Sequence, residues 1–206
     1  MRTTTVIGLT GQTGAGKTTV CSILKGRGIA IIDADQVSRD VVDEQKQCLA
    51  DLALEFSIEI LNVDGTLNRD RLANIVFGDK AKLKKLNSII FPYIIANIRE
   101  KIDAHRKAGT QLVVLDAPTL FESGADSFCD VVLSVVAPET ERLNRIVIRD
   151  RLGDAQARAR MGAQHPDEFY TKRSKYVIVN DSDLEELRLR TLQVIDQITA
   201  EAAQTE

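Results

Sequence analysis

The segment Gly11–Thr18, with the sequence GQTGAGKT, matches the pattern G-x-x-x-x-G-K-[S/T] and follows a short apolar run that ends at Leu9. Its glycines allow backbone conformations that a Cβ atom would forbid, so successive N–H groups can point inward at a polyphosphate. Lys17 adds a charge for the β- and γ-phosphates, the Thr18 hydroxyl can ligate Mg²⁺, and the following helix directs its positive end at the same place. The pattern therefore predicts that this chain binds the phosphates of a nucleotide. A glycine-rich turn without a ligand is the disfavoured alternative.

Two carboxylates, Asp33 and Asp35, follow the second apolar run of the chain. Ligands of open parallel sheets bind beyond the carboxyl ends of the strands, which is also the edge where the glycine-rich loop begins. Asp33 can there orient an acceptor hydroxyl and take its proton, so we predict it as the base of a phosphoryl transfer. Alternatively, Asp33 only caps the next helix or holds Mg²⁺ through water. Asp35 is a second candidate for the cap of that helix. Asp116 ends a third apolar run and resembles a Walker B aspartate, but an Asp is also common in turns, so its role stays open.

Arginines gather in the last third of the chain. Arg145 and Arg149 are four residues apart on one face of a predicted helix that also carries Arg142, and a second arginine-rich segment covers residues 154–162. Guanidinium groups brought over a transferring phosphoryl group would stabilise its charge and exclude water. The cluster therefore predicts a lid, although a solvated ion pair is the alternative for any single member.

Apolar runs that alternate with helical patterns predict an α/β fold with a parallel five-stranded sheet. The first helix is expected over Thr18–Gly26, and the last follows a capping box at Ser182–Glu185. The expected strands are Val6–Leu9, Ile29–Ile32, Leu112–Asp116, Val131–Val136 and Tyr176–Val179.

The segment between the second and third strands is helical throughout, with one turn signal at Asn62–Gly65 and a new helix from Asn68 or Arg69. We expect one domain over residues 1–206. Its nucleotide-binding core covers about 1–35, 108–140 and 174–206, a helical insertion covers about 36–107, and the arginine-rich lid covers about 141–173.

Composition limits the classes of protein that this chain can belong to. The net charge of −3 argues against broad binding to nucleic acid, and no apolar run approaches the roughly 18 residues of a membrane span. Three distant cysteines, without C-x-x-C pairs, favour reduced thiols over a disulfide framework or a zinc site. The first residues lack the pattern of a secretory signal, so a cytoplasmic protein is expected.

Several separate motifs together resemble the dephospho-coenzyme A kinase family over nearly the whole chain. The segments similar to this family are Gly11–Thr19, Ile32–Asp35, Asp64–Arg69, Pro118–Glu122, Arg145–Asp150, Arg160–Gln164 and Val177–Asn180. The chain departs from the family pattern at Phe91, where a His usually precedes the Pro, at Asn87, where Glu is frequent, and at Lys175, where Asp is common. The departures bear on polar contacts to the acceptor and leave the ATP site untouched.

The resemblance implies a P-loop NTPase core and an enzyme that transfers the γ-phosphate of ATP to the ribose 3′-hydroxyl of dephospho-coenzyme A, with Mg²⁺ as cofactor. It implies catalytic roles for Lys17, for Asp33 as the base and for Arg149 as a lid contact, with the helical insertion binding the acceptor. The positions it assigns to ATP are Gly14, Ala15, Gly16, Lys17, Thr18, Thr19, Arg145 and Asn180, the last near the adenine. Thr18 would also hold the metal. The residues that would bind the acceptor are Asp35, Arg69, Leu120 and Glu122.

Two other functions remain open from the sequence. One is a different P-loop nucleotide or small-molecule kinase, because the same core serves many acceptors. The other is a nucleotide-binding sensor that no longer turns over, against which the intact Lys17, Asp33 and Arg149 count. No partner among nucleic acids or membranes is expected, and the oligomeric state stays open with a monomer slightly favoured.

Overall fold

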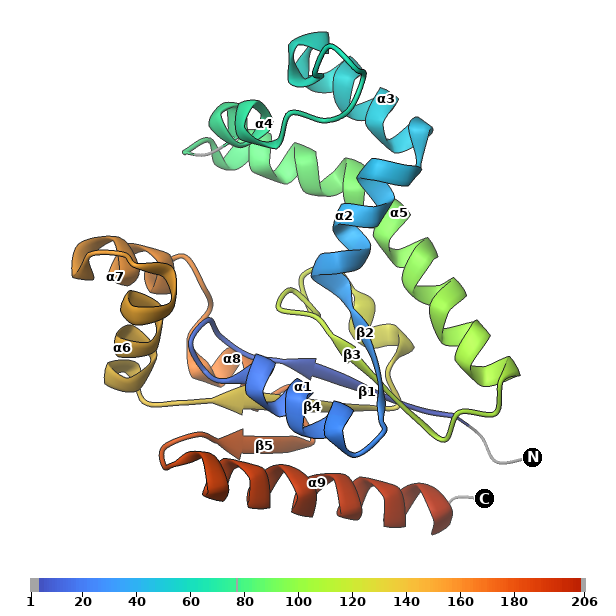
Figure 1. Ribbon diagram of the computed structural model, residues 1–206, viewed down its shortest axis with the longest axis vertical. Helices are drawn as coiled ribbons and strands as arrows, with labels where there is room; N and C mark the ends of the chain where they lie inside the picture. Colours follow the sequence, from blue (N-terminus) through green and yellow to red (C-terminus); the bar gives the residue numbers. More distant parts are fainter. Residues whose placement is uncertain (1–3, 77, 205–206) are drawn as a thin grey trace. The chain divides into compact units, whose positions relative to one another are not determined.

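The computed structural model describes residues 4–76 and 78–204. Five strands form one parallel sheet in the order β2-β3-β1-β4-β5, with β1 in the centre (Figure 1). This confirms the α/β fold that the alternating pattern predicts. The strands are β1 (Thr5–Thr10), β2 (Ala30–Asp33), β3 (Leu112–Asp116), β4 (Val131–Val136) and β5 (Tyr176–Val179).

The last three strands have the bounds expected from the sequence, whereas the first two differ at their ends. β1 is one residue longer at each end, because Thr5 and Thr10 pair with Leu112 of β3 and Ser134 of β4. β2 begins and ends one residue later than the apolar run Ile29–Ile32. Pairing with neighbours sets these ends, and a polar threonine or aspartate can continue a strand when its backbone is paired.

Contact clustering divides the chain into two compact units, one made of residues up to Ile32 and from Ile102 onward, and one of Asp33–Lys101. The first unit contains the loop, nearly all of the sheet and the arginine-rich segment. Its helices are α1 (Lys17–Gly26), α6 (Glu139–Asp150), α7 (Asp154–Gly162), α8 (Asp167–Thr171) and α9 (Leu184–Gln204), with a 3₁₀ turn at Ala125–Phe128.

Helices α1 and α9 cover one face of the sheet, where their buried side chains join Ile7, Leu133 and Ile178 in one apolar cluster. Thr191, the polar member of the α9 stripe, is fully buried and its hydroxyl donates to the Leu187 carbonyl at 2.7 Å. The threonine thus satisfies its hydroxyl within its own helix, and it packs in the core without a distant partner.

The predicted capping box at the start of α9 is wrong by one residue. The Asp183 carboxylate accepts the N–H of Glu186 at 2.9 Å, and the helix begins at Leu184. Asp is as good an N-cap as Ser, so residue type alone does not favour Ser182 over Asp183. Leu184, expected at the start of the buried stripe, is instead exposed.

The second unit is helical, as expected between the second and third strands, and its last helix continues past the boundary between the units. Its elements are α2 (Ala34–Glu44), α3 (Lys46–Phe56), a 3₁₀ turn at Ile58–Ile60, α4 (Arg69–Val76) and α5 (Lys80–Lys107). The predicted turn at Asn62–Gly65 is present: an antiparallel bridge joins Leu61 to Leu67, and Gly65 has a φ of 83°. None of the described helices is long and apolar enough to cross a membrane.

Candidate active site at the phosphate-binding loop

The glycine-rich loop connects the end of β1 to the first turn of α1. Its three glycines all have positive φ, 134° at Gly11, 76° at Gly14 and 109° at Gly16, and Gly16 is the N-cap of α1. Residues with a Cβ rarely adopt these conformations, so the chain needs glycine at each position. The loop therefore ends at the positive end of a helix, where backbone N–H groups remain available to an anion.

Close packing excludes a side chain from the same three positions. A Cβ at Gly11 would lie 2.1 Å from the Val135 carbonyl oxygen, one at Gly14 would lie 2.8 Å from the carbonyl oxygen of Arg142, and one at Gly16 would lie 2.3 Å from the Asn180 amide nitrogen. The glycines thus fit the loop against β4, α6 and the end of β5 in addition to allowing its backbone conformation.

We expect Gly11→Ala to destabilise the protein by at least about 3 kcal/mol, because the new Cβ would meet a strand backbone at an unfavourable φ. For a chain of this size that loss corresponds to a fall in Tm of at least about 6 °C, measured by thermal unfolding. Gly26→Ala is the matched control: Gly26 is helical, and nothing lies within 4 Å of a Cβ added there. Equal Tm values for the two variants would contradict the assigned role of Gly11.

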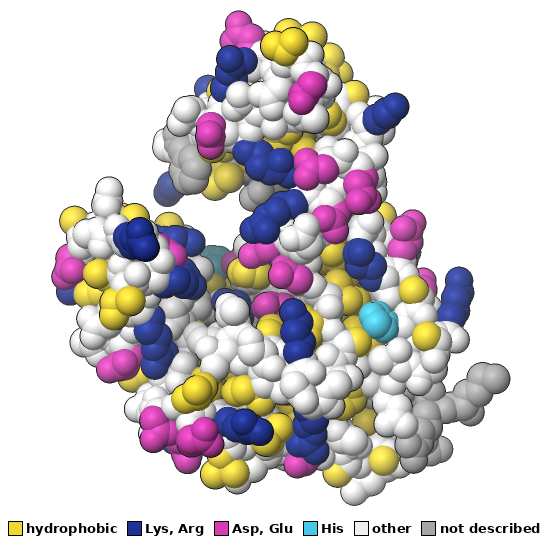
Figure 2. All heavy atoms as spheres, in the orientation of Figure 1, with side chains coloured by type: hydrophobic (Ala, Val, Ile, Leu, Met, Phe, Trp, Pro, Cys, Tyr) yellow, Lys and Arg dark blue, Asp and Glu magenta, His cyan; other side chains and the backbone are white. Residues whose placement is uncertain are grey.

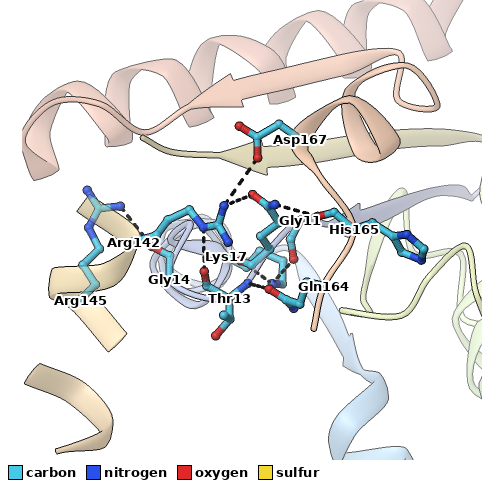
Figure 3. A network of polar contacts seen from close by, with 10 residues as sticks. Gly11, Thr13, Gly14, Lys17, Arg142, Arg145, Gln164, His165 and Asp167 are labelled. Atoms are coloured by element: carbon cyan, nitrogen blue, oxygen red, sulfur yellow. Dashed lines mark hydrogen bonds and ion pairs between the residues drawn. The ribbon is translucent and has the colours of Figure 1, made fainter. Parts of the chain in front are cut away.

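Lys17 lies across the inside of the loop. Its ammonium nitrogen donates to the Gly11 carbonyl at 2.6 Å and lies 3.4 Å from the Gln12 carbonyl (Figure 3). Thr18 is exposed and Thr19 partly buried on the first turn of α1. The residues that the motif assigns to phosphate and metal thus lie together at the start of this helix.

Side chains from distant segments hold the outer side of the loop. Arg142 of α6 is 5% exposed; its Nε donates to the Thr13 carbonyl at 3.1 Å and its terminal nitrogen to the side-chain oxygen of Gln12. Gln164 accepts the N–H of Thr13 at 2.8 Å, and the Gln12 amide donates to the His165 carbonyl at 2.8 Å (Figure 3). The segment after α7 is therefore bonded directly to the loop.

Arg145 and Asn180, both assigned to ATP by the resemblance, contact the loop itself in this structure. The Asn180 amide donates to the Ala15 carbonyl at 2.8 Å and is buried. Arg145 donates to the Gly14 carbonyl at 3.3 Å and to the Asn180 carbonyl at 3.4 Å. Their backbone partners give both residues a defined role in holding the loop, whereas their contacts with ATP stay a prediction.

Figure 2 shows Lys and Arg side chains mixed with acidic ones over the α6–α7 segment. Arg149 lies in the last turn of α6, beside the loop. Its guanidinium makes two bonds to Asp150, at 2.7 and 2.9 Å, and lies 3.4 Å from the Thr13 hydroxyl. Arg160 donates to Oδ2 of Asp150 at 2.7 Å, the same oxygen that accepts the longer of the two Arg149 bonds. The bonds to Asp150 raise the pKa of the Arg149 guanidinium, and the same bonds from Arg149 lower the pKa of the Asp150 carboxyl, so both groups stay charged at neutral pH.

Asp33 ends β2 and caps α2, where its carboxylate accepts the N–H of Gln36 at 3.0 Å. Of the two residues that the sequence offers as the cap of this helix, Asp33 is the N-cap, and Asp35 lies in the first turn of α2. Capping uses one oxygen of Asp33 and is compatible with a further role for the other. Asp116, at the end of β3, accepts a hydrogen bond from the Cys21 thiol at 3.2 Å.

The residues assigned to the acceptor lie in different settings. Leu120 is fully buried and would contact a Cβ at Gly8 of β1, which favours a packing role for its side chain. Glu122 lies 3.6 Å from His165, whose ring stacks on Phe169 with centroids 3.8 Å apart. Arg69, in the second unit, makes an ion pair with Asp43 at 3.0 Å. Acceptor binding by these side chains stays a prediction.

Sequence reasoning missed Gln12 and the role of Arg142. Gln12 falls on an unspecified position of the loop pattern, and Arg142 was counted with the lid arginines although its guanidinium is buried against the loop. The signal available in the sequence is weak: Arg142 immediately precedes Leu143, which lies on the buried face of α6. Only the fold shows that this face meets the loop.

Comparisons with known proteins identify the family of this chain. The family model described as dephospho-CoA kinase matches residues 5–186. The chain belongs to the dephospho-CoA kinase family. It is 39% identical over 192 residues to the dephospho-CoA kinase of Corynebacterium efficiens, covering 93% of this chain and 96% of the relative, and 38% identical to that of Carboxydothermus hydrogenoformans, covering 93% of each.

Solved structures show the same fold. TT1252 from Thermus thermophilus matches with a TM-score of 0.78 and 32% identity, over 94% of this chain and 96% of that one. Dephospho-CoA kinase from Campylobacter jejuni matches with a TM-score of 0.72 and 28% identity, over 95% and 98%. Shikimate kinase from Acinetobacter baumannii, at 13% identity and a TM-score of 0.52 over 97% and 96% of the two chains, shares the fold alone. Family membership makes this chain a kinase, and the resemblance identified from the motifs is confirmed.

Proposed function

We propose that this chain transfers the γ-phosphate of ATP to the ribose 3′-hydroxyl of dephospho-CoA, giving CoA and ADP. The observation that carries the proposal is a P-loop with the required backbone geometry, at the carboxyl edge of a parallel sheet, in a chain that matches the family over residues 5–186. We expect it to act in the cytoplasm on this small-molecule acceptor.

The loop supplies most of what phosphoryl transfer needs. Backbone N–H groups at the start of α1 and the ammonium of Lys17 would hold the β- and γ-phosphates and neutralise their charge. Asp33 would accept the proton of the acceptor hydroxyl as its oxygen bonds to the γ-phosphorus and the bond from that phosphorus to the β–γ bridging oxygen breaks. Arg149, with its pKa raised and its charge retained, would contact the transferring group from the lid.

Thr18 would hold Mg²⁺ through its hydroxyl, since it is exposed on the first turn of α1 beside the predicted phosphate position. A hydroxyl oxygen is a ligand suited to this hard cation, so the residue fits the proposed role. When bound, Mg²⁺ supplies positive charge to the oxygens of the β- and γ-phosphates.

Two of the three departures from the family pattern lie in the proposed acceptor-binding part of the fold, and one lies outside it. Lys175 precedes β5 at its amino end, and its ammonium donates to Glu201 of α9 at 2.5 Å. Because ligands of parallel sheets bind at the opposite edge, we expect Lys175 to lie outside the acceptor site, in an exposed ion pair. Asn87 and Phe91 lie on α5 in the helical unit, which we propose as the acceptor-binding part.

A two-acceptor assay tests the proposed function. Purified protein with ATP and Mg²⁺ is expected to form ADP when dephospho-CoA is added and to stay at background with nucleoside monophosphates, as measured by coupled ADP detection. A preference for monophosphates would instead identify a nucleotide kinase. ATP binding without turnover on either acceptor would favour the sensor.

A further inference from the structure

Arg142 is an unusual residue for a lid. Within residues 4–76 and 78–204 it is the only charged side chain in the buried set, with 5% of its surface exposed. Burying a charge is unfavourable unless partners compensate it, and here burial lowers the pKa of Arg142 although a guanidinium remains protonated at neutral pH. A buried arginine that stays charged at a cost in free energy needs a role other than lid closure.

Three partners surround its guanidinium, which Figure 3 shows between Asp167 and the loop. Nε donates to the Thr13 carbonyl at 3.1 Å, one terminal nitrogen donates to the Gln12 side chain, and the same nitrogen lies 3.7 Å from Asp167. Asp167 begins α8, so the carboxylate that balances the charge comes from a segment 25 residues further along the chain. Arg142 thereby connects the loop to the end of the arginine-rich segment.

Peptide geometry gives this contact a consequence for the nucleotide. The C=O of Thr13 and the N–H of Gly14 belong to one planar trans peptide, so they point in opposite directions. A donor that fixes the Thr13 carbonyl from outside must turn the Gly14 N–H to the inner side of the loop. The bond from Asn180 to the Ala15 carbonyl, at 2.8 Å, acts in the same way on the Gly16 N–H.

The neighbouring peptide shows the opposite arrangement. Thr13 N–H points outward to Gln164 at 2.8 Å, and the Gln12 carbonyl of the same peptide points inward, 3.4 Å from the Lys17 ammonium and 3.2 Å from the Ala15 N–H. Adjacent peptides are thus held in alternate orientations by side chains outside the loop. Without Arg142 the Thr13–Gly14 peptide would keep no charged donor on its outer side among the contacts that the structure describes.

We propose that Arg142 is a positioning residue for ATP binding: it acts through the Thr13 carbonyl and orients the Gly14 N–H toward the phosphates without contacting them. Asp167 holds the guanidinium in place, and Gln12 accepts its second bond. The inference depends on the proposed ATP site and adds to it a residue outside the eight-residue motif. It also separates Arg142 from Arg145 and Arg149, which are more exposed on the same helix.

The test compares Arg142→Met and Arg142→Lys by calorimetric titration with ATP and Mg²⁺ in the absence of acceptor. Arg142→Met keeps most of the side-chain volume but loses every donor, and we expect its Kd for ATP to rise about tenfold or more. Arg142→Lys keeps one donor and the charge and should recover part of the affinity. Arg27→Met is the matched control, since Arg27 follows the last turn of α1, outside the loop and the arginine-rich segment, and makes an exposed ion pair with Asp196 at 2.5 Å; its Kd should stay at the wild-type value.

A second readout separates positioning from a loss of folding. In ¹⁵N-labelled protein, the Gly14 amide resonance should shift in Arg142→Met and lose its response to added ATP, while resonances of α9 stay unchanged. If Arg142→Met does not fold, Asp167→Asn keeps the guanidinium and should raise the Kd in the same direction by a smaller factor. A folded Arg142→Met with wild-type Kd would overturn the inference, whereas failure of the wild-type protein to bind ATP would overturn the proposed function.

Discussion

Asp33→Asn is expected to lower kcat by about a thousandfold, within the range for loss of a general base, while the affinity for ATP stays near the wild-type value. The neutral amide fits the same space but cannot take the proton of the acceptor hydroxyl. The substitution is well suited to this chain because Asn is as good an N-cap as Asp, so the bond to the Gln36 N–H and the start of α2 are retained. Steady-state turnover with dephospho-CoA and a separate ATP titration give the two quantities.

Two further variants complete this test. Asp33→Ala removes the cap as well, so any additional loss of stability relative to Asp33→Asn measures the capping role. Asp40→Asn changes another carboxylate of α2, one that accepts a bond from the Gln36 side chain at 2.7 Å, and should leave kcat within about twofold of wild type. Turnover of Asp33→Asn near the wild-type rate would remove Asp33 from the catalytic role and leave it as a helix cap.

Lys17→Ala should weaken ATP binding and lower kcat together, by about tenfold or more in affinity and about a hundredfold or more in rate. Its ammonium already lies at the loop, bonded to the Gly11 carbonyl at 2.6 Å, so it is positioned for charge on the phosphates before and during transfer. An interaction that is present in the ground state and becomes stronger in the transition state changes both the ATP affinity and kcat, whereas loss of the base changes kcat alone.

Lys25→Ala provides the control for this second variant. Lys25 lies in the last turn of the same helix and is exposed, so it tests the general effect of removing a lysine from α1. We expect neither ATP affinity nor kcat to change in the control. A Lys17→Ala protein with unchanged affinity would show that the loop holds phosphate through its backbone alone.

Much of the fold follows from local sequence because the strands are short apolar runs bounded by polar residues. The bounds of three strands are correctly predicted, because each strand ends with its apolar run or with the aspartate that follows it. These strands are Leu112–Asp116, Val131–Val136 and Tyr176–Val179. The ends of β1 and β2 depend on pairing partners more than 70 residues away, and these are not visible in a local pattern.

The candidate site also has a part that the local sequence predicts and a part that it does not. The inner side of the loop is encoded in eight consecutive residues and could be predicted, since glycine, lysine and threonine have distinct physical uses there. The outer side depends on side chains from positions 129 to 165 residues further along the chain, such as Arg142 and Asn180. Nothing in their local sequence distinguishes a residue that binds the loop from one that binds a ligand, so their roles required the structure.

The helical unit Asp33–Lys101 occupies one uninterrupted stretch of the chain, and the side chains that hold the loop all lie outside it. On the proposed assignment, substitutions in that stretch beyond the base Asp33 can change which acceptor is phosphorylated and leave unchanged the side chains that hold the phosphate-binding loop. Departures such as Asn87 and Phe91, which lie on α5 within this stretch, would then alter acceptor binding while the side chains that hold the loop stay as they are.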